Sequence, residues 1–266
     1  MKKYKLGMLG VGNMGGSILE GIIKSSIYNK EEILLYDVNP NVVEKYKKED
    51  IAFSKNEKEL VENVEILILA IKPQMLSCLE NIKFEISNLV VVSIVAGKTL
   101  KNLAEIFGKQ KFIRVMPNTP ALIKKGATAI SRTSDIDDET FEIVKKMFSS
   151  IGIVEEIPDA LMNEVIPLNG SMPAFLYYFA KCFIDKAIKD GIEYDVAKNL
   201  VCEAIKGSAD MILTSGKDID TLIKDVCSPK GATLEGLKVF EEENEKEIIE
   251  KVADATIKRA YELSKI

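Results

Sequence analysis

The chain has 266 residues, of which 47% are hydrophobic, and this is enough to bury a sizeable core in one large domain or two ordinary ones. Its 36 basic and 41 acidic residues give a net charge of −5 and form no basic block, which argues against nucleic acid and anionic membranes as partners. The chain contains no histidine, which excludes Ser-His-Asp hydrolases, histidine-ligated zinc sites and dehydrogenases with a histidine acid or base.

The remaining composition points to a cytoplasmic protein without metal. The longest apolar run, Leu89 to Gly97, is far shorter than the roughly 20 residues of a membrane helix. Residues 1–5 lead into no apolar segment typical of a signal peptide, so none is expected. Neither a CxxC pair nor metal-ligand spacing occurs among the cysteines, which we expect to be free thiols: Cys78, Cys182, Cys202 and Cys227.

Short apolar runs alternate with helix-like segments up to about residue 157. This pattern predicts an α/β fold, a Rossmann-type domain over residues 1–157 with a parallel sheet covered by helices on both faces. Strands that are apolar on both sides, as in residues 66–70, fit such a sheet. The predicted strands are Lys5–Leu9, Ile33–Tyr36, Glu65–Ala70, Leu89–Ala96, Lys111–Val115, Ala127–Ser131 and Ile151–Glu155.

After Pro158 the apolar residues recur at helical spacing, which predicts an all-helical C-terminal domain over residues 158–266. The clearest stretches are Phe175–Ile188, Val196–Leu213 and Ile248–Ala260. Pro167 and Pro173 are expected to bend or break the first helix. Helices with this much apolar periodicity favour pairing with a second copy, so we expect a homo-oligomer, a dimer or an assembly of dimers.

A glycine-rich motif follows the first predicted strand and leads into a helix. In it Gly10 permits a tight turn, Gly12 lets the backbone approach a pyrophosphate, and Gly15 allows close helix packing. The anion would lie at the helix N-terminus, where free N–H groups favour negative charge. The motif therefore predicts a dinucleotide site.

Asp37 ends the second predicted strand at the distance expected for a ribose-binding carboxylate. Such a group binds the 2′-hydroxyl of NAD and repels a 2′-phosphate unless a basic residue compensates. Its neighbours Val38, Asn39 and Pro40 supply no base, so physical reasoning alone favours NADH.

Several longer motifs, in this order and spacing, resemble those of pyrroline-5-carboxylate reductases over almost the whole chain. The Met-Pro-Asn-Thr-Pro run and the late Ser-Pro-x-Gly-x-Thr loop are specific, whereas the first glycine motif is shared by many dehydrogenases. The motifs are Gly10–Gly15, Ala70–Gln74, Val92–Gly97, Arg114–Ala121, Gly170–Phe175 and Cys227–Thr233.

The resemblance implies a cofactor pocket at the C-terminal ends of the strands, where open α/β sheets bind ligands. Since the family commonly uses NADPH, both NADPH and NADH stay open as cofactors. Together with Gly15 and Asp37, the implied cofactor residues are Leu9, Gly10, Val11, Gly12, Asn13, Met14, Asn39, Asn56, Ala70, Ile71, Lys72, Pro73, Val95, Ala96 and Gly97.

The resemblance also implies that the late loop binds the substrate carboxylate and imine. Thr233 would hydrogen-bond the imine nitrogen, while Ser228 and the loop amides, with Gly231 and Ala232, would hold the carboxylate. Asp159 matches an acidic residue near substrate in some relatives. Ser228 and Thr233 could instead serve only as helix caps.

Lys230 departs from the family pattern, which usually has a second glycine there. A positive φ at this position would disfavour lysine. The side chain could add a cation near the substrate carboxylate or point to solvent.

The resemblance implies reduction of the cyclic imine 1-pyrroline-5-carboxylate to L-proline. This reaction suits a histidine-free chain, because it needs position more than side-chain chemistry. Two alternatives remain open. One is a lysine-using hydroxyacid or ketoacid reductase, and the other a nucleotide-sensing protein that has lost catalysis, for which Lys230 is the only hint.

Overall fold

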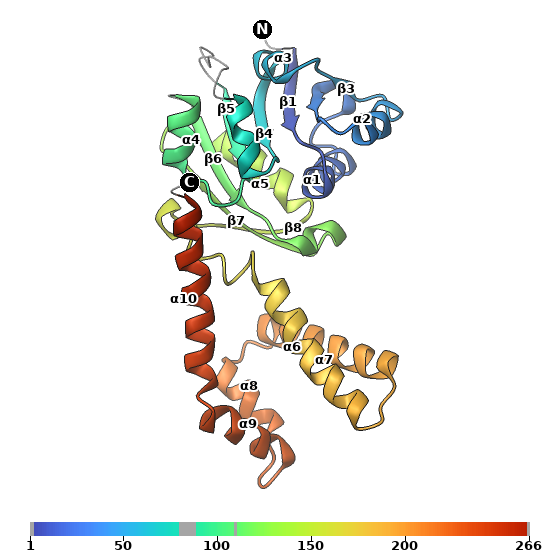
Figure 1. Ribbon diagram of the computed structural model, residues 1–266, viewed down its shortest axis with the longest axis vertical. Coiled ribbons are helices and arrows are strands. Elements are labelled where there is room, and N and C mark those ends of the chain that lie inside the picture. Colours follow the sequence, from blue (N-terminus) through green and yellow to red (C-terminus); the bar gives the residue numbers. More distant parts are fainter. Residues whose placement is uncertain (1–2, 80–88, 109–110, 265–266) are drawn as a thin grey trace. The chain divides into compact units, whose positions relative to one another are not determined.

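A computed structural model describes residues 3–79, 89–108 and 111–264, apart from the side chains of Ser77 and Cys78. The chain divides into two compact units (Figure 1). The first unit comprises Met1–Pro173 together with Thr256–Ile266, and the second comprises Ala174–Ala255.

The first unit is built on one sheet, to which the described residues contribute eight strands in the order β3-β2-β1-β4-β5-β6-β7-β8. The predicted strands are all present, within a few residues at their ends. An additional strand, β3, has only two residues, which is too short for any apolar pattern. The bounds are β1 (Tyr4–Leu9), β2 (Ile33–Tyr36), β3 (Ala52–Phe53), β4 (Val64–Leu69), β5 (Val90–Ser93), β6 (Lys111–Met116), β7 (Gly126–Arg132) and β8 (Gly152–Glu156).

The sheet is parallel from β3 through β6, but β7 pairs antiparallel with β6. The expectation of a wholly parallel sheet is therefore wrong at its last two strands. Residues 117–125 are fewer than the dozen or so that a parallel crossover needs, so the chain turns back at once. β8 returns parallel to β7 after a helical crossover.

Helices cover both faces of this sheet (Figure 1), as the apolar strands predict. One core layer packs α1 (Asn13–Lys24), α2 (Pro40–Lys47) and α5 (Asp138–Ser149) on one face. In the other core layer, α3 (Glu57–Asn63) and α4 (Leu100–Phe107) pack on the opposite face of the sheet. Successive strand residues alternate between the layers, as Ile66 and Ile68 do with Leu67 and Leu69. The Rossmann-type fold is confirmed.

The second unit is all-helical, as predicted. Pro173 lies in the first turn of its first helix, where no N–H partner is needed, so this proline does not break the helix as expected. Pro167 precedes the helix. The bounds are α6 (Met172–Lys189), α7 (Tyr194–Thr214), α8 (Ile219–Val226), α9 (Ala232–Glu242) and α10 (Glu245–Ser264), of which α10 ends in the first unit.

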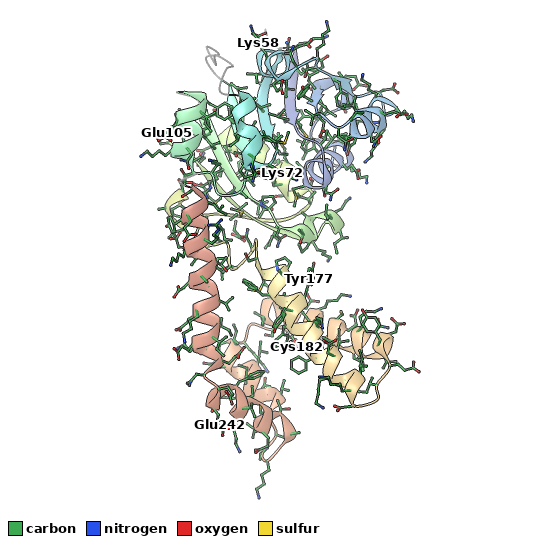
Figure 2. The ribbon with its side chains drawn as sticks, in the orientation of Figure 1. Lys58, Lys72, Glu105, Tyr177, Cys182 and Glu242 are labelled. Carbon is green, nitrogen blue, oxygen red and sulfur yellow. The ribbon has the colours of Figure 1, made fainter. Side chains whose placement is uncertain are left out.

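The helical unit has almost no core of its own. Within residues 174–255, all of them described, only Ile184 and Ala197 are buried. Large apolar side chains are exposed instead, Tyr177 (Figure 2) by 66% and Leu213 by 81%. Apolar surface on this scale indicates an interface with another chain.

The boundary expected between residues 157 and 158 differs from the division by packing. Residues 158–173 belong with the first unit because Asn163 and Asn169 bond to its sheet, as described below. A boundary at 157 and 158 stays a prediction. None of the described helices is both long and apolar enough to cross a membrane.

Candidate functional site

The ends of four parallel strands form the edge where the predicted cofactor residues gather. Leu9 of β1 pairs in register with Tyr36 of β2 and Leu69 of β4, and Leu69 pairs with Ser93 of β5. Main-chain bonds continue this alignment beyond the strands, since Ala70 N–H donates to the Leu9 carbonyl at 2.8 Å. The turns after these strands therefore share one edge of the sheet.

The turn after β1 requires glycine at two positions. Gly10 has a φ of +89°, and a β-carbon there would lie 2.6 Å from the Ala70 carbonyl oxygen. A β-carbon on Gly15 would lie 2.4 Å from the Gly10 carbonyl oxygen, so the first turn of α1 packs directly on the loop. These two glycines perform the turn and packing roles predicted from the sequence.

Gly12 differs, because a β-carbon on it would meet nothing within 4 Å. It is the N-cap of α1, and no side chain caps the helix there. The first N–H groups of α1, beginning at Asn13 and Met14, thus face the open space beside Gly12 without a side-chain acceptor. A pyrophosphate fits this arrangement, which combines room for a close approach with free donors at a helix N-terminus.

Asp37 holds two main-chain N–H groups. Its Oδ2 accepts from Val11 and its Oδ1 from Asn39, each at 2.8 Å. Asn39 in turn caps α2, because its Oδ1 accepts from the Asn41 N–H at 3.0 Å. No sequence pattern predicts this structural role of Asp37, and its contact with ribose stays a prediction.

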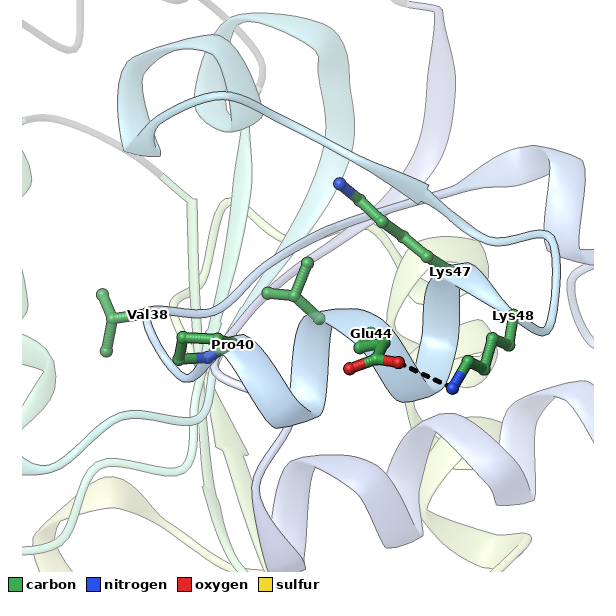
Figure 3. A pocket seen from close by; sticks show the side chains of 6 residues that line it. Val38, Pro40, Glu44, Lys47 and Lys48 are labelled. Atoms are coloured by element: carbon green, nitrogen blue, oxygen red, sulfur yellow. Dashed lines mark hydrogen bonds and ion pairs between the residues drawn. The ribbon is translucent and has the colours of Figure 1, made fainter.

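A groove of about 570 Å³ runs along α2 beyond the end of β2 (Figure 3). Its lining includes Val38, Pro40 and Val43, and the cations Lys47 and Lys48. Lys48 pairs with Glu44 at 2.7 Å, whereas Lys47 makes no ion pair with any described residue. The immediate sequence neighbours of Asp37 do not include Lys47, so they do not predict this cation. The helical spacing along α2 is the signal that could have predicted it.

The other predicted cofactor residues lie after β3, β4 and β5. Asn56 caps α3, accepting from the Glu59 N–H at 2.9 Å. Lys72, labelled in Figure 2, is exposed after β4, between Ile71 and Pro73. After β5 the chain turns at Gly97, where φ is +73°, with Val95 buried and Ala96 exposed.

Asp159 contacts a buried cation at the end of the sheet. Arg114 of β6, 2% exposed, lies 3.3 Å from Asp159 Oδ1 and donates to Asn163 Oδ1 at 2.8 Å. About a third of the Asp159 side chain is exposed. A buried guanidinium requires such partners, so Asp159 has a structural role besides the substrate contact, which stays a prediction.

In the second unit, residues 228–231 form a turn before α9. Gly231 N–H donates to the Ser228 carbonyl at 2.9 Å, and Lys230, the third residue of the turn, has a φ of +63°. A proline at the second position and a positive φ at the third are typical of a type II turn. Gly231, and not Ser228, is the N-cap of α9, and no side chain caps this helix. The alternative that Ser228 and Thr233 serve only as helix caps is therefore wrong.

The N-terminus of α9 consequently offers free donors. Ala232 and Thr233 are the first two helical residues, whose N–H groups have no partner within the helix. Ser228, Ala232 and Thr233 are exposed in the single chain. A carboxylate is the kind of ligand that such a helix start binds.

Comparison with known proteins decides the family. Residues 159–263 match the family model for pyrroline-5-carboxylate reductase dimerisation, and residues 5–97 that for NADP oxidoreductase, coenzyme F420-dependent. The pyrroline-5-carboxylate reductase of Escherichia coli strain K12 is 32% identical over 265 residues, covering 98% of each chain. That of Methanosarcina acetivorans is 34% identical, covering 91% of each chain. The chain belongs to the pyrroline-5-carboxylate reductase family.

The fold agrees with this family over the full length. The crystal structure of Plasmodium falciparum pyrroline carboxylate reductase with NADP bound matches with a TM-score of 0.87 at 29% identity, covering 99% of each chain. The match of the helical segment to a dimerisation model accords with its exposed apolar surface and supports the expected homo-oligomer.

The remaining expectations concern cysteines and metal. Cys182 (Figure 2), Cys202 and Cys227 are free, while the side chain of Cys78 lies outside the described residues. Within the described ranges, no three His, Cys, Asp or Glu side chains are grouped so that they could hold a metal ion.

Proposed function

We propose that this member of the pyrroline-5-carboxylate reductase family reduces 1-pyrroline-5-carboxylate to L-proline with NADPH or NADH. The observation that carries the proposal is the uncapped start of α9 within the Ser-Pro-x-Gly-x-Thr loop, in a chain whose glycine turn also fits a dinucleotide pyrophosphate. Two anion-binding helix starts match a cofactor pyrophosphate and a substrate carboxylate.

In this proposal the loop binds and orients the substrate. The N–H groups of Ala232 and Thr233 and the Ser228 hydroxyl hold the carboxylate. The Thr233 hydroxyl hydrogen-bonds the ring nitrogen and relays to it, from solvent, the proton that accompanies the hydride. The bound nicotinamide supplies the hydride that the ring carbon gains, so the carbon–nitrogen double bond becomes single. Position rather than acid–base chemistry is the main contribution of the protein, which suits a histidine-free chain.

The decisive experiment measures NADPH and NADH oxidation by the full-length protein at several imine concentrations. Thr233→Ala is expected to lower kcat at least tenfold while leaving cofactor affinity within about twofold, because the hydroxyl acts on the ring nitrogen alone. Thr214→Ala is the matched control, an exposed helical threonine of the same unit whose hydroxyl only bonds the Asp210 carbonyl.

The alternatives make different predictions in the same assay. A hydroxyacid or ketoacid reductase would turn over those substrates and not the imine, and a nucleotide sensor would bind cofactor and reduce neither. Folded protein that leaves the imine unreduced refutes the proposal. The cytoplasmic location stays a prediction from the sequence.

A further inference from the structure

The end of α10 belongs to the cofactor-binding unit. Residues 256–264 cluster with the first unit, although residues 159–263 match a dimerisation model as one segment. Two contacts, made by Tyr261 and Leu263, connect this last part of the helix to the first unit.

The first contact is a hydrogen bond. Tyr261 donates its hydroxyl to Glu164 Oε1 at 2.5 Å, and this bond, with burial as a second cause, raises the pKa of Tyr261. The other oxygen, Glu164 Oε2, is buried without a partner among the described residues. Tyr261 is thus the donor that compensates a partly buried carboxylate, and loss of its hydroxyl is costly for this arrangement.

Glu164 is itself fixed to the sheet through its neighbour. Asn163, 4% exposed, accepts from the Arg114 guanidinium of β6 at 2.8 Å. A chain of polar contacts therefore runs from β6 through residues 163 and 164 to the last turns of α10. This chain sets the position of Tyr261 relative to the sheet.

The second contact lies two residues further on. A β-carbon built on Gly97 would lie 3.1 Å from the Leu263 β-carbon, so Leu263 sits directly against the turn after β5. Gly97 is buried, while Ala96 on the same turn is exposed. Leu263 thus packs against the buried glycine of a turn whose exposed residue, Ala96, is a predicted cofactor contact.

We infer that Tyr261 is a positioning residue for the cofactor: its bond to Glu164 keeps Leu263 against Gly97 and so holds the Val95–Gly97 turn in shape. The inference rests on the proposed function only in placing a dinucleotide at this turn. Neither the cofactor-domain match, residues 5–97, nor the dimerisation match assigns such a role to the end of α10.

The test measures NADPH affinity of the full-length protein by titration, alongside steady-state kinetics. Tyr261→Phe removes the hydrogen bond, and Leu263→Gly removes the β-carbon that lies against Gly97. Each is expected to raise the Kd and KM for NADPH roughly three- to tenfold. The KM for the imine and the kcat at saturating NADPH should stay within about twofold. The double variant should bind NADPH about as well as the more impaired single variant, because both changes act on the position of Leu263 against Gly97.

Two controls separate positioning from general damage. Lys258→Ala changes an exposed residue of the same helix end and should leave NADPH affinity unchanged. Glu164→Gln keeps an oxygen acceptor for Tyr261 and should affect affinity less than Tyr261→Phe does. Light scattering should find the same oligomer for every variant.

Unchanged NADPH affinity in folded Tyr261→Phe overturns the inference, as does a loss that follows a change in oligomeric state. NADPH affinity is measured without imine, so the role of Tyr261 can be tested even if the protein fails to reduce the imine. That failure would refute the proposed function alone.

Discussion

The carboxylate of Asp37 accepts the main-chain N–H of Val11 at 2.8 Å, so the acidic residue that follows β2 holds the glycine-rich turn that follows β1. A second bond from the same carboxylate, to the N–H of Asn39, ties in the start of α2. The turn after β1 and the turn from β2 into α2, which should surround the adenosine half of the cofactor, are thus connected by one carboxylate.

Replacing Asp37 should separate this structural role from any role in selecting the cofactor. Asp37→Ala removes both bonds and is expected to weaken NADH binding about tenfold, the effect of roughly 1.4 kcal/mol. NADPH binding should fall less, because a negative charge near the 2′-phosphate disappears as well. Titration with both cofactors checks this, with Asp37→Asn, which keeps one acceptor, as the intermediate. Unchanged NADH affinity in Asp37→Ala contradicts the structural role.

Two glycines of the same turn should respond differently to alanine. Gly12→Ala meets no protein atom, so the melting temperature without cofactor should stay the same, while NADPH affinity falls at least about tenfold as the methyl group blocks the pyrophosphate. Gly10→Ala meets the Ala70 carbonyl at a positive φ and should lower the melting temperature itself. Equal effects of both changes on the cofactor-free protein would show that Gly12 serves the fold and not the ligand.

Much of this architecture follows from local sequence. Continuous apolar runs predicted the strands, and the change to helical periodicity predicted the second half. The features that sequence patterns missed are very short elements and contacts between distant residues. Strand β3 has two residues, and the reversal at β7 depends on how short the connection 117–125 is. The hydrogen bond from the Val11 N–H to Asp37 and that from Arg114 to Asn163 join residues far apart in sequence, which no periodicity predicts.

The loop before α9 also shows which features the sequence predicts and which it does not. The lysine at position 230 raised the question of a positive φ, and the structure finds +63° there. A turn could be inferred from Ser-Pro-x-Gly alone, although serine first and glycine fourth favour type I and not the observed type II. The start of α9 at Ala232 could not, because Ser-Pro is equally typical of a helix opening.

Lys230→Gly is expected to stabilise the protein. Lysine in the left-handed region is strained, and glycine relieves this strain at some cost in unfolded-chain entropy, for a net gain of about 0.5–1 kcal/mol. Lys238→Gly, within α9, is the matched control and should destabilise by a similar amount. Denaturant unfolding at one fixed protein concentration measures both, since subunit association contributes to stability. A destabilised Lys230→Gly would mean that the side chain makes a contact in the oligomer that outweighs the strain.

Thr128 of β7 offers a test of the sheet interior. Its hydroxyl is buried without a hydrogen-bond partner among the described residues, so Thr128→Val should leave stability unchanged or raise it by up to about 1 kcal/mol. Thr133 is the matched control, because its hydroxyl accepts from the Phe112 N–H at 3.1 Å. Thr133→Val deprives that N–H of an acceptor and should cost about 1–3 kcal/mol. Urea unfolding monitored by circular dichroism distinguishes the two. If Thr128→Val proved as destabilising as Thr133→Val, the Thr128 hydroxyl would have to hold a buried water. The substitution would then also lower the deuterium-exchange protection of the β7 backbone amides.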